Sequence, residues 1–138
     1  KAGSIKEIRE KTDMLLLKMH AENAKDRLPS QVSGSEAQRA AIARAMVGNP
    51  GLLFADEPTG ALNKANSKEV MNLLTELNHD GQSILMVTHD VRAAIHGNRI
   101  LYLEDGKILD ELNLPPYGND DLKARENKVL SWLSSLGW

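Results

Sequence analysis

The chain has 138 residues, of which 41% are hydrophobic and 26% charged, a composition typical of a single soluble globular domain with a real core. Its formal net charge of -2 gives no indication of a nucleic-acid or anionic-membrane partner. It contains no cysteine, which excludes disulfides, thiolate metal sites and a cysteine nucleophile. No apolar run approaches the roughly 18 residues of a membrane span, and no signal-peptide pattern is present.

The N-terminal third predicts two helices separated by a loop. From residue 4 to about residue 20, apolar side chains recur at helical spacing, which predicts an amphipathic helix. A polar stretch from Asn23 contains Pro29 and predicts a loop. The second helix is expected to begin near Ser33, to continue through an alanine-rich stretch and to end at about Val47, before a Gly-Asn-Pro-Gly stretch.

From Gly51 the pattern changes to alternating strands and helices. Residues 52–55 and 83–87 are short runs that are apolar on both faces, which is typical of parallel strands covered on both sides. A helix is expected between them over residues 67–78, stopped by an Asp-Gly pair. A short helix to about Ile95 is expected after the second strand.

The C-terminal part predicts a hairpin and a helix. Residues 100–103 and 107–112 flank an Asp-Gly pair, which is a strong hairpin signal. Residues 114–118 contain two prolines and a glycine and predict a linker. Asn119 or Asp120 would cap the final helix. Its apolar stripe would consist of Leu122, Val129, Leu133 and Leu136, with Trp132 beside it.

Two adjacent carboxylates, Asp56 and Glu57, follow the first predicted parallel strand, and His89 follows the next one. Ligands of open parallel α/β sheets sit beyond the carboxyl ends of the strands, so these side chains are expected to lie close together. A metal-binding acid, a second acid that orients water and a histidine are the parts of a phosphate-cleaving site. The alternative interpretation is a solvated turn at the two acids and a helix-capping role for His89.

Ser33 and Glu36 have the spacing of a capping box. The simpler interpretation is that they only begin the alanine-rich helix. A helix N-terminus with small residues also offers free backbone N–H groups and a favourable dipole to an anion. The hydroxyls of Ser33 and Ser35 would add donors there.

Taken together, these motifs resemble those of one family, the ATPases of ABC transporters. VSGSEAQRAAIARAM at 32–46 is similar to the signature motif, and GLLFADEPTGAL at 51–62 to the Walker B strand, catalytic glutamate and D-loop. MVTHD at 86–90 is similar to the switch-histidine loop, and RILYLEDGKI at 99–108 fits the strands that follow. The motifs are in the right order, and the resemblance covers about residues 10–112. It is greatest to the export and resistance branch, which handles lipoproteins, macrolides or antimicrobial peptides.

The resemblance implies a role for each matching position. Asp56 would hold Mg²⁺ through water, Glu57 would be the general base, and His89 would contact the γ-phosphate. The signature would bind the γ-phosphate of an ATP molecule held by the opposite subunit. The signature residues are Ser33, Gly34, Ser35 and Glu36, and the D-loop residues are Ala61, Leu62 and Asn63.

The family's mode of action implies a head-to-tail dimer with ATP between its two subunits. Closure on ATP and reopening after hydrolysis would drive membrane-spanning permease subunits. The resemblance thus implies a second ATPase subunit and a permease as partners, no nucleic acid, and a peripheral location on the cytoplasmic face of the cell membrane.

This sequence departs from the family pattern at three positions. Ser35 stands where a second glycine is usual, so the close backbone approach to phosphate is expected to weaken or change. Ala37 stands where a glutamine is common, and Asn63 replaces the usual D-loop aspartate. Because Asp56, Glu57 and His89 are intact, the hydrolytic half of the site is the better preserved half.

A Walker A loop is absent from this sequence, because none of its 10 glycines begins the pattern Gly, four residues, Gly-Lys and Ser or Thr. The expected fold class is therefore α/β: an incomplete P-loop NTPase (RecA-like) parallel sheet with part of the ABC helical subdomain. Residues 1–47 would be part of the helical subdomain, 48–113 the C-terminal part of the ATPase core, and 114–138 a linker and C-terminal helix.

Three functions stay open at this point. The chain would be the C-terminal part of an ABC-transporter ATPase subunit, a non-transport ABC-type ATPase, or a short non-enzymatic partner that supplies only the signature face. On the first interpretation the fragment alone is expected to be inactive. It is also expected to self-associate, since its apolar strand faces would lack cover.

Overall fold

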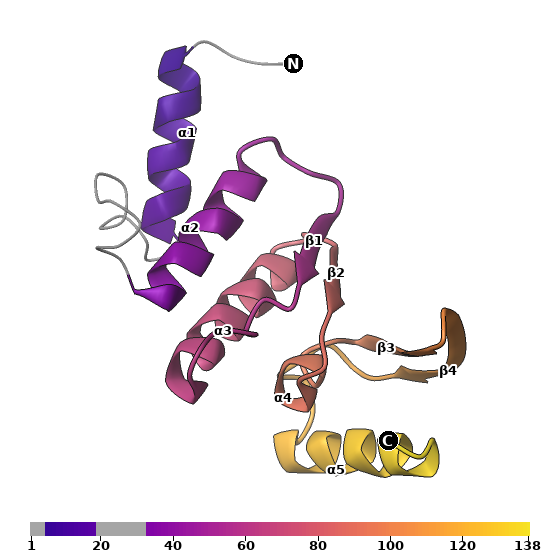
Figure 1. Ribbon diagram of the computed structural model, residues 1–138. Helices are drawn as coiled ribbons and strands as arrows, with labels where there is room; N and C mark the ends of the chain where they lie inside the picture. The colour runs from indigo at the N-terminus through magenta and orange to yellow at the C-terminus, as the bar shows by residue number, and fades with distance from the viewer. Residues whose placement is uncertain (1–4, 19–32) are drawn as a thin grey trace. The chain divides into compact units, whose positions relative to one another are not determined.

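The computed structural model describes residues 5–18 and 33–138, and it divides into two compact units, residues 1–87 and 88–138 (Figure 1). The first unit contains α1 (Ile5–Lys18), α2 (Gly34–Met46), β1 (Leu53–Asp56), α3 (Lys64–His79) and β2 (Ile84–Val87). The second contains α4 (Val91–Ala94), β3 (Arg99–Glu104), β4 (Lys107–Asn113) and α5 (Leu122–Ser135). No helix in the described ranges has the length and apolar content needed to cross a bilayer. The expected domain divisions after residues 47 and 113 stay predictions.

Helix α1 confirms the helix predicted at the N-terminus, although part of its apolar stripe is not covered. Ile5 is 74% exposed and Ile8 is 40% exposed. The helical spacing therefore identified the element, whereas these two apolar side chains of its stripe stay exposed among the described residues. The predicted helix end near residue 20 and the predicted loop up to residue 32 lie outside the described residues.

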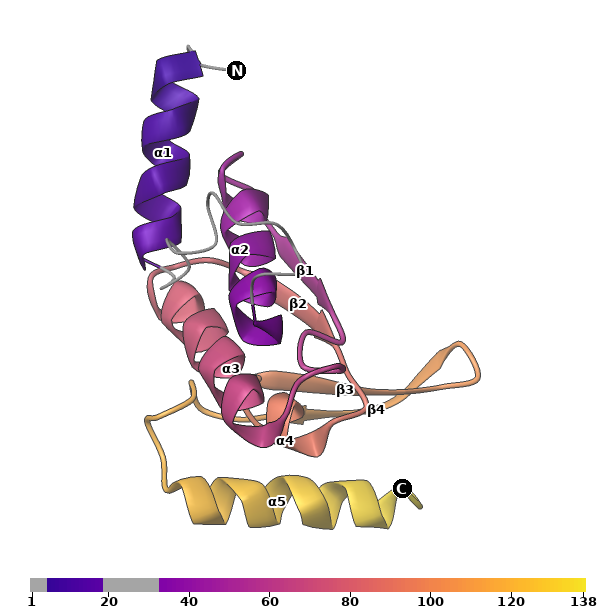
Figure 2. The same ribbon diagram turned by 60° about the vertical axis from the view of Figure 1, so that its left-hand side comes forward.

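Strands β1 and β2 form the predicted parallel pair, with Leu53 opposite Ile84 and Asp56 opposite Val87. Helices α2 and α3 lie on one side of this pair (Figures 1 and 2). Leu53 faces these helices and is buried, and α3 contributes most of the apolar side chains packed beneath the strands. The buried apolar residues of α3 are Val70, Met71, Leu73, Leu74 and Leu77.

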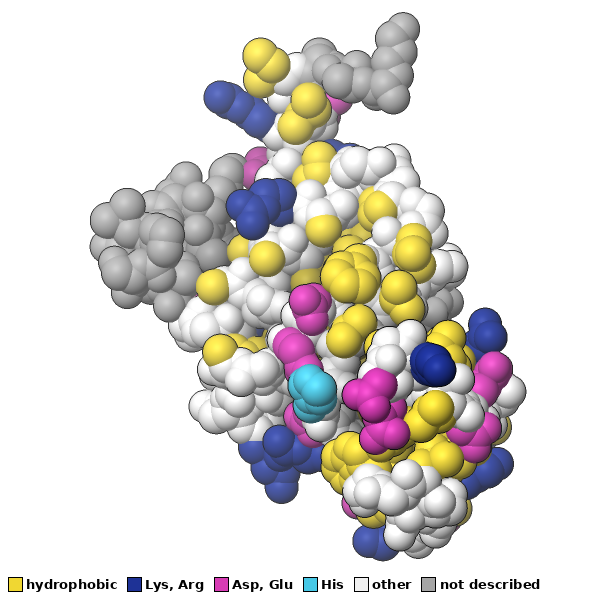
Figure 3. All heavy atoms as spheres, turned by 45° about the vertical axis from the view of Figure 1, so that its right-hand side comes forward, with side chains coloured by type: hydrophobic (Ala, Val, Ile, Leu, Met, Phe, Trp, Pro, Cys, Tyr) yellow, Lys and Arg dark blue, Asp and Glu magenta, His cyan; other side chains and the backbone are white. Residues whose placement is uncertain are grey.

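The opposite face of the β1–β2 pair is exposed among the described residues, which agrees with the expectation that apolar strand faces would lack cover and differs from the two-sided cover that is typical of such strands. Phe54, Leu85 and Val87 are 58%, 47% and 44% exposed. Figure 3 shows hydrophobic side chains gathered over this face. A strand that is apolar on both faces indicates burial only when a second layer is available, and the described residues supply one layer.

Helix α3 begins three residues earlier than predicted, because Asn63 caps it. The Asn63 side-chain oxygen accepts the backbone N–H of Asn66 at 2.8 Å, and its carbonyl accepts that of Ser67 at 2.8 Å. The helix ends at His79, and Gly81 follows with a φ of +104, which glycine adopts without strain. The predicted stop at the Asp-Gly pair is therefore confirmed.

In the second unit, β3 and β4 form the predicted antiparallel hairpin. Asp105 and Gly106 have φ values of 50 and 75, as a two-residue turn with left-handed central residues requires. Helix α4 is capped by Asp90, whose carboxylate accepts the backbone N–H of Arg92 at 2.9 Å. The alternative in which His89 caps this helix is therefore wrong.

Helix α5 begins one or two residues later than predicted, because its N-cap is Asp121 and not Asp120 or Asn119. Val129 and Leu133 are buried, together with Leu114 at the start of the predicted linker. Leu122, which the stripe pattern placed in the core, is 48% exposed. The side chains packed around this core are Val91, Ile95, Ile100, Tyr102, Leu112 and Trp132.

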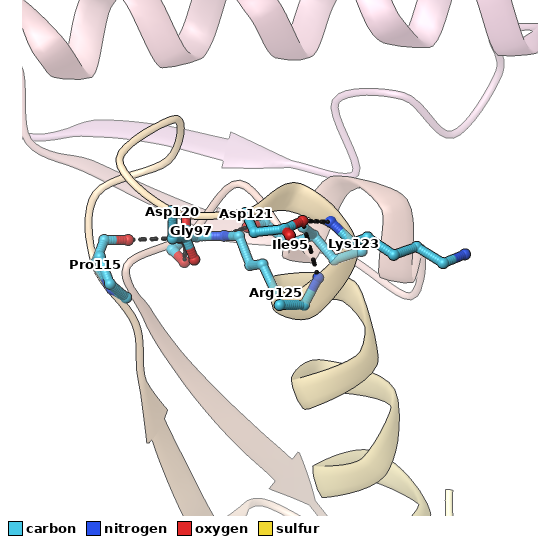
Figure 4. Close-up of polar contacts among 8 residues, drawn as sticks. Ile95, Gly97, Pro115, Asp120, Asp121, Lys123 and Arg125 are labelled. Carbon is cyan, nitrogen blue, oxygen red and sulfur yellow. Dashed lines mark hydrogen bonds and ion pairs between the residues drawn. The ribbon is translucent and has the colours of Figure 1, made fainter.

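Arg125 of α5 is 1% exposed and joins three segments of the second unit (Figure 4). Its guanidinium donates to the carbonyl oxygens of Ile95 and Pro115, each at 2.6 Å. It also donates to the carbonyl oxygen of Gly97 at 2.8 Å and to both carboxylate oxygens of Asp120 at 3.1 and 3.2 Å. A buried arginine is tolerated here because its donors meet acceptors in a planar, fork-shaped arrangement.

The aromatic ring of Tyr117 contacts both Arg125 and His96. It stacks on the His96 ring with centroids 3.9 Å apart, and the Arg125 guanidinium carbon lies 5.3 Å from its centroid. Burial, and then the positive charge of Arg125, lower the pKa of His96 to about 4. The imidazole is therefore neutral near pH 7, so it adds no second positive charge beside the buried guanidinium.

We expect Arg125→Met to destabilise the second unit by about 3–5 kcal/mol, because it leaves a partly buried carboxylate and three carbonyl groups without their donor. Both tryptophans of the chain lie in this unit. Urea unfolding followed by tryptophan fluorescence therefore reports on it directly. Arg92→Met is the matched control, because Arg92 pairs with Asp90 at 3.3 Å but its side chain is 66% exposed. Equal losses in the two variants would contradict a special role for Arg125.

We expect the 138-residue chain to self-associate through the open face of the β1–β2 pair. Size-exclusion chromatography with light scattering should show a mass that rises with protein concentration. Phe54→Glu should lower the association, whereas Leu130→Glu, at an apolar side chain that is 42% exposed on α5, should leave it unchanged. A monomer at every concentration would contradict the expectation.

Candidate functional site

The chain turns sharply where β1 ends. Asp56 is the last residue of the strand and is exposed, and the backbone N–H of Glu57 donates to the carbonyl of Val87 at 2.7 Å. The hydrogen-bond ladder thus continues one residue beyond the strand. Glu57 has a φ of 47, which is uncommon for a residue with a side chain. Backbone strain of this kind concentrates at functional positions, so Glu57 is a candidate on structural grounds as well.

Two turns follow Glu57 and lead to the predicted D-loop. The N–H of Gly60 donates to the carbonyl of Glu57 at 3.0 Å, and the N–H of Leu62 donates to that of Thr59 at 3.1 Å. A Cβ atom on Gly60 would lie 3.3 Å from the Glu57 carbonyl oxygen, so a larger residue would disturb the turn. Thr59 is 5% exposed, and its hydroxyl has no hydrogen-bond partner within the described ranges.

The predicted capping box at the start of α2 is confirmed. The Ser33 hydroxyl oxygen accepts the N–H of Glu36 at 3.1 Å, and the Glu36 carboxylate accepts the N–H of Ser33 at 3.2 Å. These bonds engage two of the free N–H groups at this terminus. The N–H groups of Gly34 and Ser35, at the first two helical positions, have no acceptor inside the helix by its geometry. They are the groups that a bound anion would meet.

The Ser35 side chain points into the first unit, away from such an anion. It is 3% exposed, and its hydroxyl donates to the Glu69 carboxylate at 3.2 Å and accepts from the Arg39 guanidinium at 3.0 Å. The expectation that this hydroxyl adds a donor for an anion is therefore wrong. The sequence pattern did not find Arg39 and Glu69 as partners, because they lie 30 residues apart with no motif to connect them.

The structure brings the predicted signature and D-loop residues together. A Cβ atom on Gly34 would come within 3.0 Å of the Leu62 Cδ2 atom, so the two residues are in close contact. Leu62 is half-buried, and Asn63 next to it caps α3 through its side-chain oxygen. Residues 33–36 and 61–63 therefore form one continuous surface at the N-terminal ends of α2 and α3.

The structure confirms only part of the predicted cluster of acids and histidine. The pairing of Asp56 with Val87 places the ends of β1 and β2 side by side. His89 is exposed and follows β2 by two residues, but it belongs to the second unit, so its approach to the carboxylates stays a prediction.

The described residues include no group of three or more histidine and acidic side chains placed to hold a metal ion. Mg²⁺ in phosphate-transfer sites is held by one or two carboxylates, with phosphate oxygens and water completing the shell. The exposed carboxylate of Asp56 at a strand end fits a magnesium site in which the protein supplies only one or two carboxylate ligands.

Comparisons with known proteins identify the family. A family model described as ABC transporter matches residues 4–60. The macrolide export ATP-binding/permease protein MacB of Pasteurella multocida is 37% identical over 127 residues, which are 92% of this chain and 19% of that protein. The lipoprotein-releasing system ATP-binding protein LolD of Aquifex aeolicus is 45% identical over 107 residues, which are 78% of this chain and 48% of that protein. The chain belongs to the ABC-transporter ATP-binding family.

Solved structures of ABC cassettes confirm the fold class. The ATP-binding cassette MJ0796 of Methanocaldococcus jannaschii, solved as a dimer bound to ADP and Pi, superimposes with a TM-score of 0.70 and 39% identity. The match covers 85% of this ABC chain and 51% of the cassette. A second cassette, MJ1267, has a TM-score of 0.78 at 21% identity and supports the fold alone. The chain therefore has a mixed α/β fold that corresponds to about half of an ABC cassette.

We expect Thr59→Val to leave this ABC chain as stable or to stabilise it by about 1 kcal/mol, because it removes a buried hydroxyl that lacks a partner. Urea unfolding followed by helical circular dichroism measures the change. Thr75→Val is the matched control, because the Thr75 hydroxyl donates to the Met71 carbonyl at 2.9 Å, and its removal should bring no gain. A loss of more than about 1 kcal/mol at Thr59 would show that its hydroxyl is satisfied after all.

Proposed function

We propose that this chain is part of an ABC-transporter ATPase subunit that binds and hydrolyses ATP in a head-to-tail dimer and so drives transport across a membrane. The observation that carries the proposal is the strained turn after β1. There Glu57 is held at a φ of 47 by its hydrogen bond to Val87, directly after the exposed carboxylate of Asp56. Asp56 is part of the strand, whereas Glu57 has a left-handed backbone conformation, so the two neighbouring acids suit two different tasks.

The chemistry divides between these residues. Asp56 would hold Mg²⁺ through water, and the ion, when bound, neutralises charge on the phosphates of ATP. Glu57 would act as general base, accepting a hydrogen bond from the attacking water and aligning it with the γ-phosphate. His89, in the loop after β2, would contact the γ-phosphate beside that water.

The signature end of α2 would serve the ATP molecule of the opposite subunit. The N–H groups of Gly34 and Ser35 and the positive end of the helix dipole suit the γ-phosphate. Ser33 and Glu36 maintain this terminus through the capping box. The D-loop residues Ala61, Leu62 and Asn63 are continuous with it. The dimeric state of MJ0796, bound to ADP and Pi, supports this arrangement.

The partners would be a second ATPase subunit and membrane-spanning permease subunits, with this subunit peripheral on the cytoplasmic face of the membrane. The names of the relatives, macrolide export and lipoprotein release, support an export system. The chain spans about half of LolD and about a fifth of MacB. Transport by the whole protein is therefore proposed from its relatives and from this half-cassette.

A second candidate function is a short, non-enzymatic partner that supplies only the signature face to a complete ATPase. The 138 residues contain no Walker A pattern, and this candidate would not require one. Against it stands the pair of acids after β1, since a subunit that donated only its signature would not require them. A non-transport ABC-type ATPase has no supporting feature here, because the net charge is -2 and basic patches are not evident in the sequence.

In a complete subunit that carries this sequence, we expect Glu57→Gln to lower ATP turnover by a factor of at least about 100 while ATP binding is retained. Phosphate release measures turnover, and binding of a fluorescent ATP analogue measures affinity. Glu104→Gln, at an exposed residue next to the hairpin turn, is the matched control and should leave both unchanged.

The 138-residue chain alone should show negligible turnover, since it has no Walker A loop. Turnover by this chain that disappears with Glu57→Gln would contradict that expectation. In the complete subunit, a Glu57→Gln variant with weaker ATP binding and an unchanged kcat would contradict the role of Glu57 as general base.

A further inference from the structure

Three side chains join the first two turns of α2 to α3. The Glu69 carboxylate of α3 accepts from the Ser35 hydroxyl at 3.2 Å and forms an ion pair with the Arg39 guanidinium at 2.5 Å. The same guanidinium nitrogen donates to the Ser35 hydroxyl at 3.0 Å, which closes a triangle of polar contacts. The Ser35 residue is 3% exposed and the Arg39 side chain 11% exposed, whereas the Glu69 side chain is 57% exposed, so only the α2 side of this triangle is shielded from water. Charge-assisted hydrogen bonds are stronger than neutral ones.

The same turn of α2 is limited on another side by the D-loop. Gly34 lies against Leu62, and a Cβ atom at residue 34 would already be at 3.0 Å from the leucine side chain. The first turn of α2 is therefore closely packed against residues 61–63. The polar triangle joins the same turn to α3. Together the two contacts limit the movement of the backbone that carries the N–H groups of Gly34 and Ser35.

We propose that Glu69 is a positioning residue that acts through Ser35 and Arg39 to hold the signature turn of α2 in place for the γ-phosphate. For its effect on ATP this inference rests on the proposed function, whereas its effect on the turn itself does not. Glu69 touches no reacting atom. It sets the direction of the backbone donors that would do so.

The triangle also gives a structural role to Ser35, which stands where a second glycine is usual in the family. A serine in place of glycine adds a side chain, but here the side chain turns toward α3 and leaves the outward side of the backbone open. Glycine would leave that outward side equally open but would remove the hydroxyl from the triangle. Serine therefore leaves the backbone N–H groups accessible, and its hydroxyl supplies one of the three polar groups of the triangle.

The first test is amide hydrogen exchange of the turn at residues 33–36 in the 138-residue chain, read by NMR at Ser33 and Glu36, whose N–H groups have acceptors in this turn. Glu69→Gln keeps the size of the side chain and removes its charge. It should speed exchange in this turn by about fivefold to tenfold, the effect of losing one charge-assisted contact. Glu76→Gln, the same substitution on the exposed side of α3, is the matched control and should change nothing.

The second test is ATP hydrolysis by the complete subunit over a range of ATP concentrations. Glu69→Gln and Ser35→Gly should each raise the half-saturating ATP concentration by about fivefold, with kcat reduced by less than about twofold. A purely structural loss would instead reduce the active fraction, so kcat would fall with the half-saturating concentration unchanged. The double variant Ser35→Gly/Glu69→Gln should be little worse than either single variant, because both remove the same triangle.

The outcomes separate this inference from the proposed function. Exchange in residues 33–36 that is the same in Glu69→Gln as in the unchanged chain overturns the inference, even if Glu57→Gln abolishes turnover. Faster exchange together with an unchanged half-saturating ATP concentration also overturns it, because the turn would then be held for some other purpose. A complete subunit without ATPase activity overturns the proposed function, while faster exchange would still support the hold of Glu69 on the signature turn.

Discussion

The hydrogen bond from Glu57 N–H to the Val87 carbonyl is the interaction on which the candidate site depends. At 2.7 Å it extends the parallel pairing of β1 and β2 beyond Asp56 and holds the next residue at a positive φ. Without it, the chain would leave the strand in extended form and the two adjacent acids would point to opposite sides of the sheet. The turn at Glu57 ends the alternation of side chains between the two faces of the strand. The two turns that follow it lead the chain through Thr59 and Gly60 to Leu62.

That path connects Asp56 and Glu57 to the predicted signature of the same chain. The turns after Glu57 bring Leu62 against Gly34, and Asn63 then begins α3, whose Glu69 reaches back to Ser35. The acids, the D-loop and the start of α2 are thus linked through short, packed contacts within one unit. In the head-to-tail dimer that we propose, the acids would serve one ATP molecule and the signature the other. A displacement of the turn after β1 would then change the contacts of this chain with both ATP molecules.

Much of this organisation was predictable from the sequence, and the exceptions share a physical cause. Local signals identified the helices, the hairpin, the parallel strands and the capping box of Ser33 and Glu36, because each depends on residues close together in the chain. The start of α3 was missed because Asn63 was considered as a D-loop residue and not as a cap, although asparagine is a preferred N-cap residue. The open face of Phe54 agrees with the expectation that apolar strand faces would lack cover, but strand composition does not report that α2 and α3 cover the other face. The Ser35–Arg39–Glu69 triangle has no sequence signal, since it depends on how α2 packs on α3.

The direction of the Ser35 side chain changes how its substitution should be understood. A motif comparison treats serine in place of glycine as a loss, because the added Cβ is assumed to stand between the backbone and the phosphate. In the structure the side chain takes the inward position at the second residue of α2, where Arg39 and Glu69 supply a donor and an acceptor. Gly34 is different, since a side chain at that position meets Leu62. The two positions of the motif therefore have unequal requirements. Glycine at the first position permits close packing against the predicted D-loop, and serine at the second position bonds to Arg39 and Glu69.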